Sequence, residues 1–245
     1  MNIYKNKLNL LFALFFVYLI LFEFILEHNK FLPKPSILFE SLFQIWKDYN
    51  LLSGIIITAG IVYFSIAISF ILLWMLKTPL IKFFANHSSG LGSLQLLKSI
   101  PVFMLIMLTS LWFEASELAK SVFIFLVTFF TLLRVLAKEL PLTKKEYLET
   151  AFNLSPDKIY SEVYWKSSLP SLFELAVRFQ RVLWLIVLVY EFVSMSFGMG
   201  TIMRLALLYQ DLSGIIIIGI IQAILIWLGT ITLQFLKKKI AFWES

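Results

Sequence analysis

Long apolar runs separated by short polar segments form most of this chain. Six of these runs, near residues 8–26, 51–76, 94–113, 118–136, 172–196 and 213–236, are close in length to a membrane span. A helix needs about 20 apolar residues to cross a hydrocarbon core of about 30 Å. The runs lack the period-two alternation of barrel strands and are too long for such strands. The pattern predicts an all-α polytopic membrane protein with about six transmembrane helices.

The first run follows Lys5 and Lys7, as the apolar part of a signal peptide would. It is long, however, and no small-residue cleavage site follows it. We interpret it as a retained transmembrane helix. The polar segments between the runs are short, so residues 1–245 are predicted to form a single transmembrane domain.

Composition agrees with this class. Hydrophobic residues make up 60% of the chain and charged residues 15%, and the mean hydropathy is +0.88. Such values are typical of a polytopic membrane protein. The 25 phenylalanines are explained by packing and by contact with lipid, and they indicate no cofactor.

The distribution of positive charge predicts the orientation. With the N-terminus in the cytoplasm, most of the 21 lysines and arginines fall on the inner side, including Lys77, Lys138, Lys158 and Lys237 to Lys239. Lysine and arginine are enriched in cytoplasmic loops. Both termini are therefore predicted to be cytoplasmic. The net charge of +6 needs no nucleic acid to explain it.

The chain contains no cysteine, which excludes disulfides, thiolate nucleophiles and thiolate metal sites. His28 and His87 are its only histidines, too few for a histidine-rich zinc site. We expect no metal and no cofactor.

Residues 31–50, between the first two runs, predict an amphipathic helix at the outer membrane interface. Pro33 and Pro35 favour an extended approach, and Ser36 is a suitable N-cap. The apolar side chains expected on one face are Ile37, Leu38, Leu42, Phe43 and Trp46. The segment is either a simple connector or a contact site for an extracellular partner.

Residues 137–171 form a polar island that the predicted orientation places in the cytoplasm. Apolar positions predict two short amphipathic helices around a turn. Ser155, Pro156 and Asp157 are a start signal for the second helix, and Leu169-Pro170 are expected to end it. Such a hairpin could rest on its own helix bundle, or one face could enter a groove on a cytoplasmic protein.

The island also carries a recognisable motif. The run Leu148-Glu149-Thr150-Ala151-Phe152-Asn153-Leu154-Ser155, followed by Leu169-Pro170, resembles the Glu-Ala-Ala loop of ABC importer permeases. Other features resemble the nitrate, sulfonate, taurine and thiamine-precursor group of these permeases. They are Leu32-Pro33-Lys34-Pro35, Ser99-Ile100-Pro101, Leu111-Trp112-Phe113, Arg178, Glu191-Phe192 and Gly198-Met199-Gly200, in that order.

The resemblance implies a type I ABC importer permease fold in the bacterial cytoplasmic (inner) membrane. Two permease subunits would form a homodimer around a substrate path. The 146–170 loop would act as a coupling helix that docks into a separate ATP-binding subunit, and an extracytoplasmic substrate-binding protein would deliver the substrate. The ATPase-coupling residues would be Glu149, Thr150, Ala151, Phe152, Asn153, Leu154, Ser155 and Pro156.

We do not expect this chain to be an enzyme or to hydrolyse ATP itself. Its nearest approach to a phosphate-binding loop is residues 92–99, GSLQLLKS. Leu97 occupies the position that requires glycine, and its side chain would obstruct the backbone cradle for phosphate.

Charged residues in the fifth run are candidates for a translocation path. Glu174 and Arg178 are four residues apart and can pair on one helix face, which Arg181 continues. They form either a structural pair or the mouth of a path for an anion. Glu191, near the end of the run, has either a structural role or a role at an external gate.

Two other classes of protein remain open, a secondary carrier and a non-transporting structural membrane subunit. A carrier usually shows an internal repeat, and we find none here. A membrane enzyme would need a polar catalytic cluster, and none with suitable spacing is present. Small organic anions, nitrate-like anions and vitamin precursors all remain possible substrates.

Overall fold

The computed structural model of the chain describes residues 2–26, 32–86, 101–114, 116–140 and 158–244. Within these ranges the chain is almost entirely helical and contains no strand, which confirms the all-α prediction there. The helices are α1 (Asn2–Ile20), α2 (Pro35–Asp48), α3 (Leu51–Met75), α4 (Lys77–Asn86), α6 (Val102–Trp112), α7 (Glu117–Glu139), α10 (Trp165–Ser194), α11 (Met199–Leu208) and α12 (Leu212–Ile240). Short π turns, η1 (Leu21–Ile25) and η4 (Ile159–Tyr164), and a 3-10 turn, η5 (Phe242–Glu244), complete the set.

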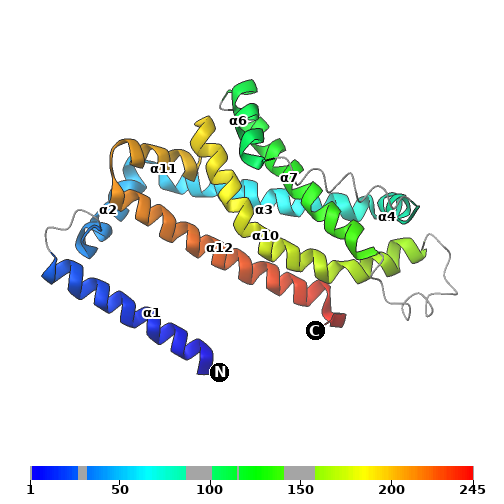
Figure 1. The fold of residues 1–245 in the computed structure, drawn as a ribbon, viewed down its shortest axis with the longest axis horizontal. Helices are drawn as coiled ribbons and strands as arrows, with labels where there is room; N and C mark the ends of the chain where they lie inside the picture. Colours follow the sequence, from blue (N-terminus) through cyan, green and yellow to red (C-terminus); the bar gives the residue numbers. More distant parts are fainter. Residues whose placement is uncertain (1, 27–31, 87–100, 115, 141–157, 245) are drawn as a thin grey trace.

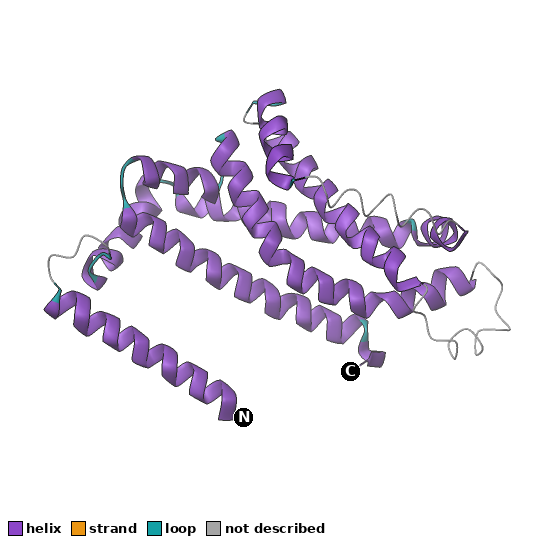
Figure 2. Ribbon diagram, in the orientation of Figure 1, coloured by secondary structure: helices purple, strands orange, loops and turns teal. Residues whose placement is uncertain are grey.

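Helices α3, α7, α10 and α12 run lengthwise through the molecule (Figure 1). Helices α2 and α11 lie at one end, while α4, η4 and the C-terminus lie at the other (Figure 1). Figure 2 shows that nearly all of the described chain is helical. Helix α10 is central, because it packs against α3, α6, α7, α11 and α12. Its Leu183, Trp184, Val187 and Tyr190 have no exposed surface.

The number of long spans differs from the prediction. Three described helices, α3, α7 and α12, are long and apolar enough to cross a membrane, and α10 with α11 adds a fourth if the bent pair is one span. The runs near 8–26 and 94–113 instead give the shorter apolar helices Phe12–Ile25 and Val102–Trp112. Six spans are therefore not found among the described residues. Helix α6 starts only after Pro101, and its 11 residues cover about 17 Å, short of a core of about 30 Å.

Pro170 does not end a helix, contrary to the prediction. Helix α10 continues through it to Ser194, directly after the π turn η4. Proline removes one backbone hydrogen bond from a helix, but Leu169, Pro170 and Leu172 are all buried here. Tertiary packing on this face outweighs the local stop signal. The predicted helix before Ser155 lies outside the described residues.

Helix α2 forms as predicted, with a different start and a different buried face. It begins at Pro35 with Lys34 as N-cap, so Ser36 does not cap it. The Ser36 N–H instead donates to the Glu23 carboxylate at 3.2 Å. Ser41 and Ile45 are buried, whereas Phe43, expected on the apolar face, is 76% exposed.

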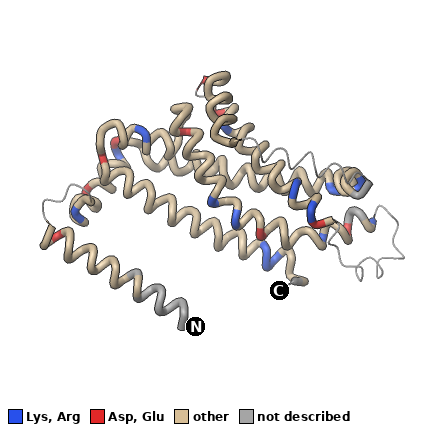
Figure 3. Tube along the Cα trace, viewed as in Figure 1, with Lys and Arg blue, Asp and Glu red and all other residues tan. Residues whose placement is uncertain are grey.

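Charged residues are sparse in the central parts of α3 and α12, whereas α10 carries several inside its length (Figure 3). Helix α3 has no charged residue, and α12 has none before Lys237. Helix α1 lies beside the bundle, and its Leu10, Phe12 and Phe16 are largely exposed. This distribution is typical of helices whose central parts face lipid.

Candidate functional site at the bend between α10 and α11

Helices α10 and α11 meet at a bend of 55°. Helix α10 ends at Ser194, Met195 adopts a left-handed conformation with φ 57°, and α11 begins at Met199 after Gly198. A buried polar group, here called the bend cluster, fills the inside of the bend. It consists of Thr58 of α3, Lys120 of α7 and Glu191 of α10, together with Gly198 and Gly200, which lie next to Glu191.

The Glu191 carboxylate is the centre of the bend cluster and has no exposed surface. Its Oε1 lies 3.3 Å from Lys120 Nζ, and its Oε2 accepts a hydrogen bond from the Gly200 N–H at 2.9 Å. The Thr58 hydroxyl donates to the same carboxylate, at 2.9 Å from each oxygen. One side chain of α10 is thus bonded to three other helices.

Lys120 is also completely buried, and three acceptors surround its ammonium group. These are Glu191 Oε1 at 3.3 Å, Glu117 Oε2 at 2.7 Å and the Phe197 carbonyl oxygen at 2.6 Å. An ammonium group has three N–H donors, so each one has a partner. The second Glu117 oxygen accepts from the Phe197 N–H at 2.7 Å. This set of bonds fixes the start of α7 against the loop before α11.

The cluster also binds the N-terminus of α11. The first N–H groups of a helix have no partner within it. The Met199 N–H donates to Thr58 Oγ1 and the Gly200 N–H to Glu191 Oε2, each at 2.9 Å. A carboxylate at this position also interacts favourably with the positive end of the helix dipole. The bend therefore satisfies backbone groups that a membrane environment would otherwise leave unbonded.

Both glycines are required by the close approach of α10. A Cβ atom on Gly198 would lie 2.1 Å from Glu191 Oε1, and Gly198 has a φ of 157°. A Cβ atom on Gly200 would lie 2.3 Å from the Leu188 carbonyl oxygen. Any side chain at Gly200 would therefore have to separate α11 from α10.

Further hydrogen bonds brace the same bend. The Thr201 hydroxyl bonds to the carbonyl oxygens of Glu191 and Ser196. The Arg204 guanidinium donates to the Phe192 carbonyl oxygen at 3.0 Å and lies over the Phe192 ring. The geometry suits a rigid joint between two helices.

The candidate path residues are divided between two places. Glu191 lies in the buried bend cluster, whereas Glu174, Arg178 and Arg181 lie on an exposed face of α10. The predicted side-chain pair of Glu174 with Arg178 is not formed. Glu174 instead pairs with Lys237 of α12 at 2.7 Å, and Arg178 Nε donates to the Glu174 backbone carbonyl at 3.4 Å.

The eight predicted coupling residues, Glu149 to Pro156, lie outside the described residues. Sequence reasoning identified neither Thr58 nor Lys120 as a partner of Glu191. The signal for Lys120 was present, because it lies near the start of an apolar run while Glu191 lies near the end of another. Opposite charges inside two spans are expected to pair with each other.

Comparison with known proteins finds no family model and no curated protein that matches this chain. Among the described residues, no group of three histidine, cysteine, aspartate or glutamate side chains could hold a metal ion. The bond from Gly200 and the ion pair with Lys120 make Glu191 an anchor between helices at the bend.

Proposed function

We propose that this chain is the permease subunit of an ABC importer. In this proposal a second copy completes the substrate path, a separate chain hydrolyses ATP, and an extracytoplasmic protein delivers the substrate. The membrane is the bacterial cytoplasmic membrane, and both termini face the cytoplasm. The substrate class is a small anion or a vitamin precursor.

The observation that carries the proposal is the ordered series of sequence features that resemble these permeases. Two of those features, Glu191-Phe192 and Gly198-Met199-Gly200, are in contact in the structure through the bond from Gly200 to Glu191. Their sequence positions alone do not require this contact. Because these two motifs meet at a tight helix bend, the contact supports one architectural role for both of them.

The position of the polar island also supports the proposal. Residues 137–171 run from the last turn of α7 through η4 into the first turns of α10, and the two long helices α7 and α10 pack against each other. The C-terminal ends of α7 and α12 carry Lys138 and Lys237 to Lys239. A docking protein that moved the island would act directly on α10, which contacts most of the bundle.

A test uses the complete chain, tagged and purified gently from its own membranes. A copurifying ATPase is expected, and Ala151→Asp or Glu149→Arg is expected to release it while the permease remains in the membrane. Glu40→Arg, an exposed charge reversal on α2, is the matched control and should retain the ATPase. Release by the control, or no release by the loop variants, would contradict the coupling assignment.

The alternatives are a secondary carrier and a non-transporting structural subunit. Recovery of the chain without an ATPase, under conditions that preserve other membrane complexes, would favour these alternatives. Substrate uptake driven by an ion gradient without ATP would then identify a carrier.

A further inference from the structure

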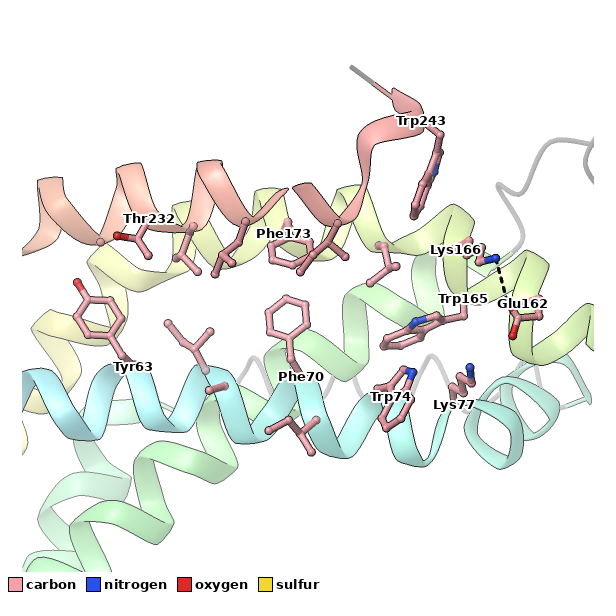
Figure 4. Close-up of a pocket in the computed structure, with 18 residues that line it drawn as sticks. Tyr63, Phe70, Trp74, Lys77, Glu162, Trp165, Lys166, Phe173, Thr232 and Trp243 are labelled. Atoms are coloured by element: carbon pink, nitrogen blue, oxygen red, sulfur yellow. Dashed lines mark ion pairs between the residues drawn. The ribbon is translucent and has the colours of Figure 1, made fainter. Parts of the chain in front are cut away.

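An apolar groove of about 840 Å³ runs between α3 and α12, with α10 as its floor (Figure 4). Phe70 of α3 and Phe173 of α10 stack in its middle, with ring centroids 4.9 Å apart. Tyr63 and Gly229 close the deep end, since a Cβ atom on Gly229 would lie 2.0 Å from the Tyr63 hydroxyl oxygen. Trp74, Trp165 and Trp243 line the other end (Figure 4).

The two hydroxyl groups that line the deep end already donate to backbone carbonyl groups. The Tyr63 hydroxyl donates to the Leu225 carbonyl at 3.0 Å, and the Thr232 hydroxyl donates to the Leu228 carbonyl at 2.9 Å. A polar ligand would therefore lose its water here without gaining these hydroxyl donors. The deep part of the groove suits a hydrocarbon chain.

The length of the groove also suits a hydrocarbon chain. Tyr63 and Trp74 mark its two ends along α3, and both line it. Their separation of eleven residues corresponds to about 17 Å of helix axis. One leaflet of the hydrocarbon core is about 15 Å thick, half of the whole. An acyl chain that entered from the tryptophan end would be covered by the groove along its whole length.

The tryptophan end carries an excess of positive charge. Lys77 and Lys166 line the groove there, and Lys77 lies over the Trp74 ring with 5.8 Å from Nζ to the ring centroid. Among the described residues that line the groove, Glu162 is the one acid, and it pairs with Lys166 at 3.0 Å (Figure 4). Two lysines and one carboxylate thus lie at this end of the groove.

We propose that this groove binds one anionic phospholipid, with an acyl chain along Phe70 and Phe173 and the phosphate between Lys77 and Lys166. Tryptophans are enriched at the level of lipid headgroups, and basic pockets between membrane helices bind anionic headgroups. The lipid would join α3 to α12, which face each other across the groove. This inference does not depend on the proposed transport function.

The experiment is a lipid titration of the purified full chain in detergent, followed by native mass spectrometry. The probes are phosphatidylglycerol and phosphatidylcholine with identical acyl chains. Wild type is expected to bind one phosphatidylglycerol molecule and to prefer it clearly over phosphatidylcholine. Lys77→Gln with Lys166→Gln should weaken this binding on the order of 25-fold, since each basic side chain near a lipid surface contributes about a factor of five.

A matched double variant controls for loss of charge. Lys47→Gln with Lys138→Gln removes two exposed lysines outside the groove and should bind as wild type does. Ala67→Trp places a bulky ring in the groove at an exposed position of α3 and should abolish binding of the preferred lipid without a change in charge. Circular dichroism establishes that each variant retains its helices.

Three outcomes would overturn the proposal. They are equal binding of the two lipids by wild type, equal phosphatidylglycerol binding by the two double variants, and unchanged binding by folded Ala67→Trp. A second copy of the chain that displaces the lipid would identify the groove as a protein interface instead. Because the titration uses this chain alone, its outcome is independent of ATPase recovery.

Discussion

Lys120 of α7 and Glu191 of α10 form an ion pair in which neither side chain has any exposed surface, with 3.3 Å between Nζ and Oε1. Two opposite charges placed together inside a helix bundle avoid most of the cost of burying each one separately. The pair also connects helices that the chain forms far apart in sequence. We expect the joint at the bend to depend on both charges together.

Removal of one partner of this pair should strongly destabilise the fold. Lys120→Met leaves Glu191 without its main counter-charge, and breaking a buried pair in this way costs about 3–5 kcal/mol. The double variant Lys120→Met with Glu191→Gln should lose less stability than the two single variants combined, because no uncompensated buried charge remains. Unfolding in detergent, followed by circular dichroism, measures each free energy.

The exposed pair Lys166–Glu162 provides the control for that measurement. Its side chains are 59% and 48% exposed, and such surface pairs contribute less than about 1 kcal/mol. Lys166→Met should therefore change the free energy of unfolding only slightly. If Lys120→Met and Lys166→Met lowered the free energy of unfolding equally, the buried pair would contribute no more to stability than the exposed pair.

A methyl group at Gly200 should disrupt the contact between α10 and α11. Its Cβ atom would lie 2.3 Å from the Leu188 carbonyl oxygen, a distance that requires the backbones to separate. Overpacking of this kind typically costs about 1–3 kcal/mol. Gly219→Ala is the matched control, since a Cβ atom on Gly219 would meet nothing within 4 Å.

The control should be neutral or slightly stabilising, because alanine is favoured over glycine inside a helix by about 0.5–1 kcal/mol. The comparison uses thermal unfolding of the two alanine variants in the same detergent. If the Gly200→Ala protein were as stable as the Gly219→Ala protein, α11 would be able to move away from α10 without loss of stability.

The apolar pattern predicted three helices well. The runs at 51–76, 118–136 and 213–236 correspond to α3, α7 and α12 within a few residues. Hydropathy succeeds here because each helix is apolar along most of its length, whatever its neighbours are. It was less successful for the run at 94–113, of which the described residues form only the short helix α6, Val102–Trp112.

The candidate site was only partly predictable, because its partners are far apart in sequence. Glu191 was singled out as an acid inside a span, but Thr58 and Lys120 come from two other helices. For Glu174, the local spacing favoured Arg178, whereas the structure pairs it with Lys237. Periodicity identifies which residues share a face of one helix, and it does not identify the helix that this face meets.

The phenol of Tyr49 provides a test of pH dependence outside the long spanning helices. Burial, followed by the negative charge of Asp211, raises the pKa of Tyr49 above its ordinary value of 10.0. The folded chain therefore keeps this proton to higher pH than the unfolded chain does. The resulting stability is fully present below the unfolded pKa and is lost as the pH rises through the folded pKa.

Tyr49→Phe retains the ring and removes this titration. The difference in free energy of unfolding between wild type and Tyr49→Phe should be constant from about pH 7 to pH 9. Above about pH 10, wild type should lose stability relative to the variant. If the difference in free energy of unfolding between the two proteins stayed constant at alkaline pH as well, the raised pKa of Tyr49 would be contradicted.

Arg178 tests the proposed substrate path, because its side chain is exposed on α10 and bonds only weakly to the Glu174 backbone, at 3.4 Å. If it contacts an anion in transit, Arg178→Ala should slow uptake about tenfold, the effect of losing a charge-assisted hydrogen bond of about 1.5 kcal/mol. Arg178→Lys, which keeps the charge, should retain more activity. Uptake into vesicles that contain the assembled complex is the measurement, with recovery of the ATPase measured in parallel. Loss of assembly in Arg178→Ala would assign Arg178 a structural role, and unchanged uptake with normal assembly would exclude it from the path.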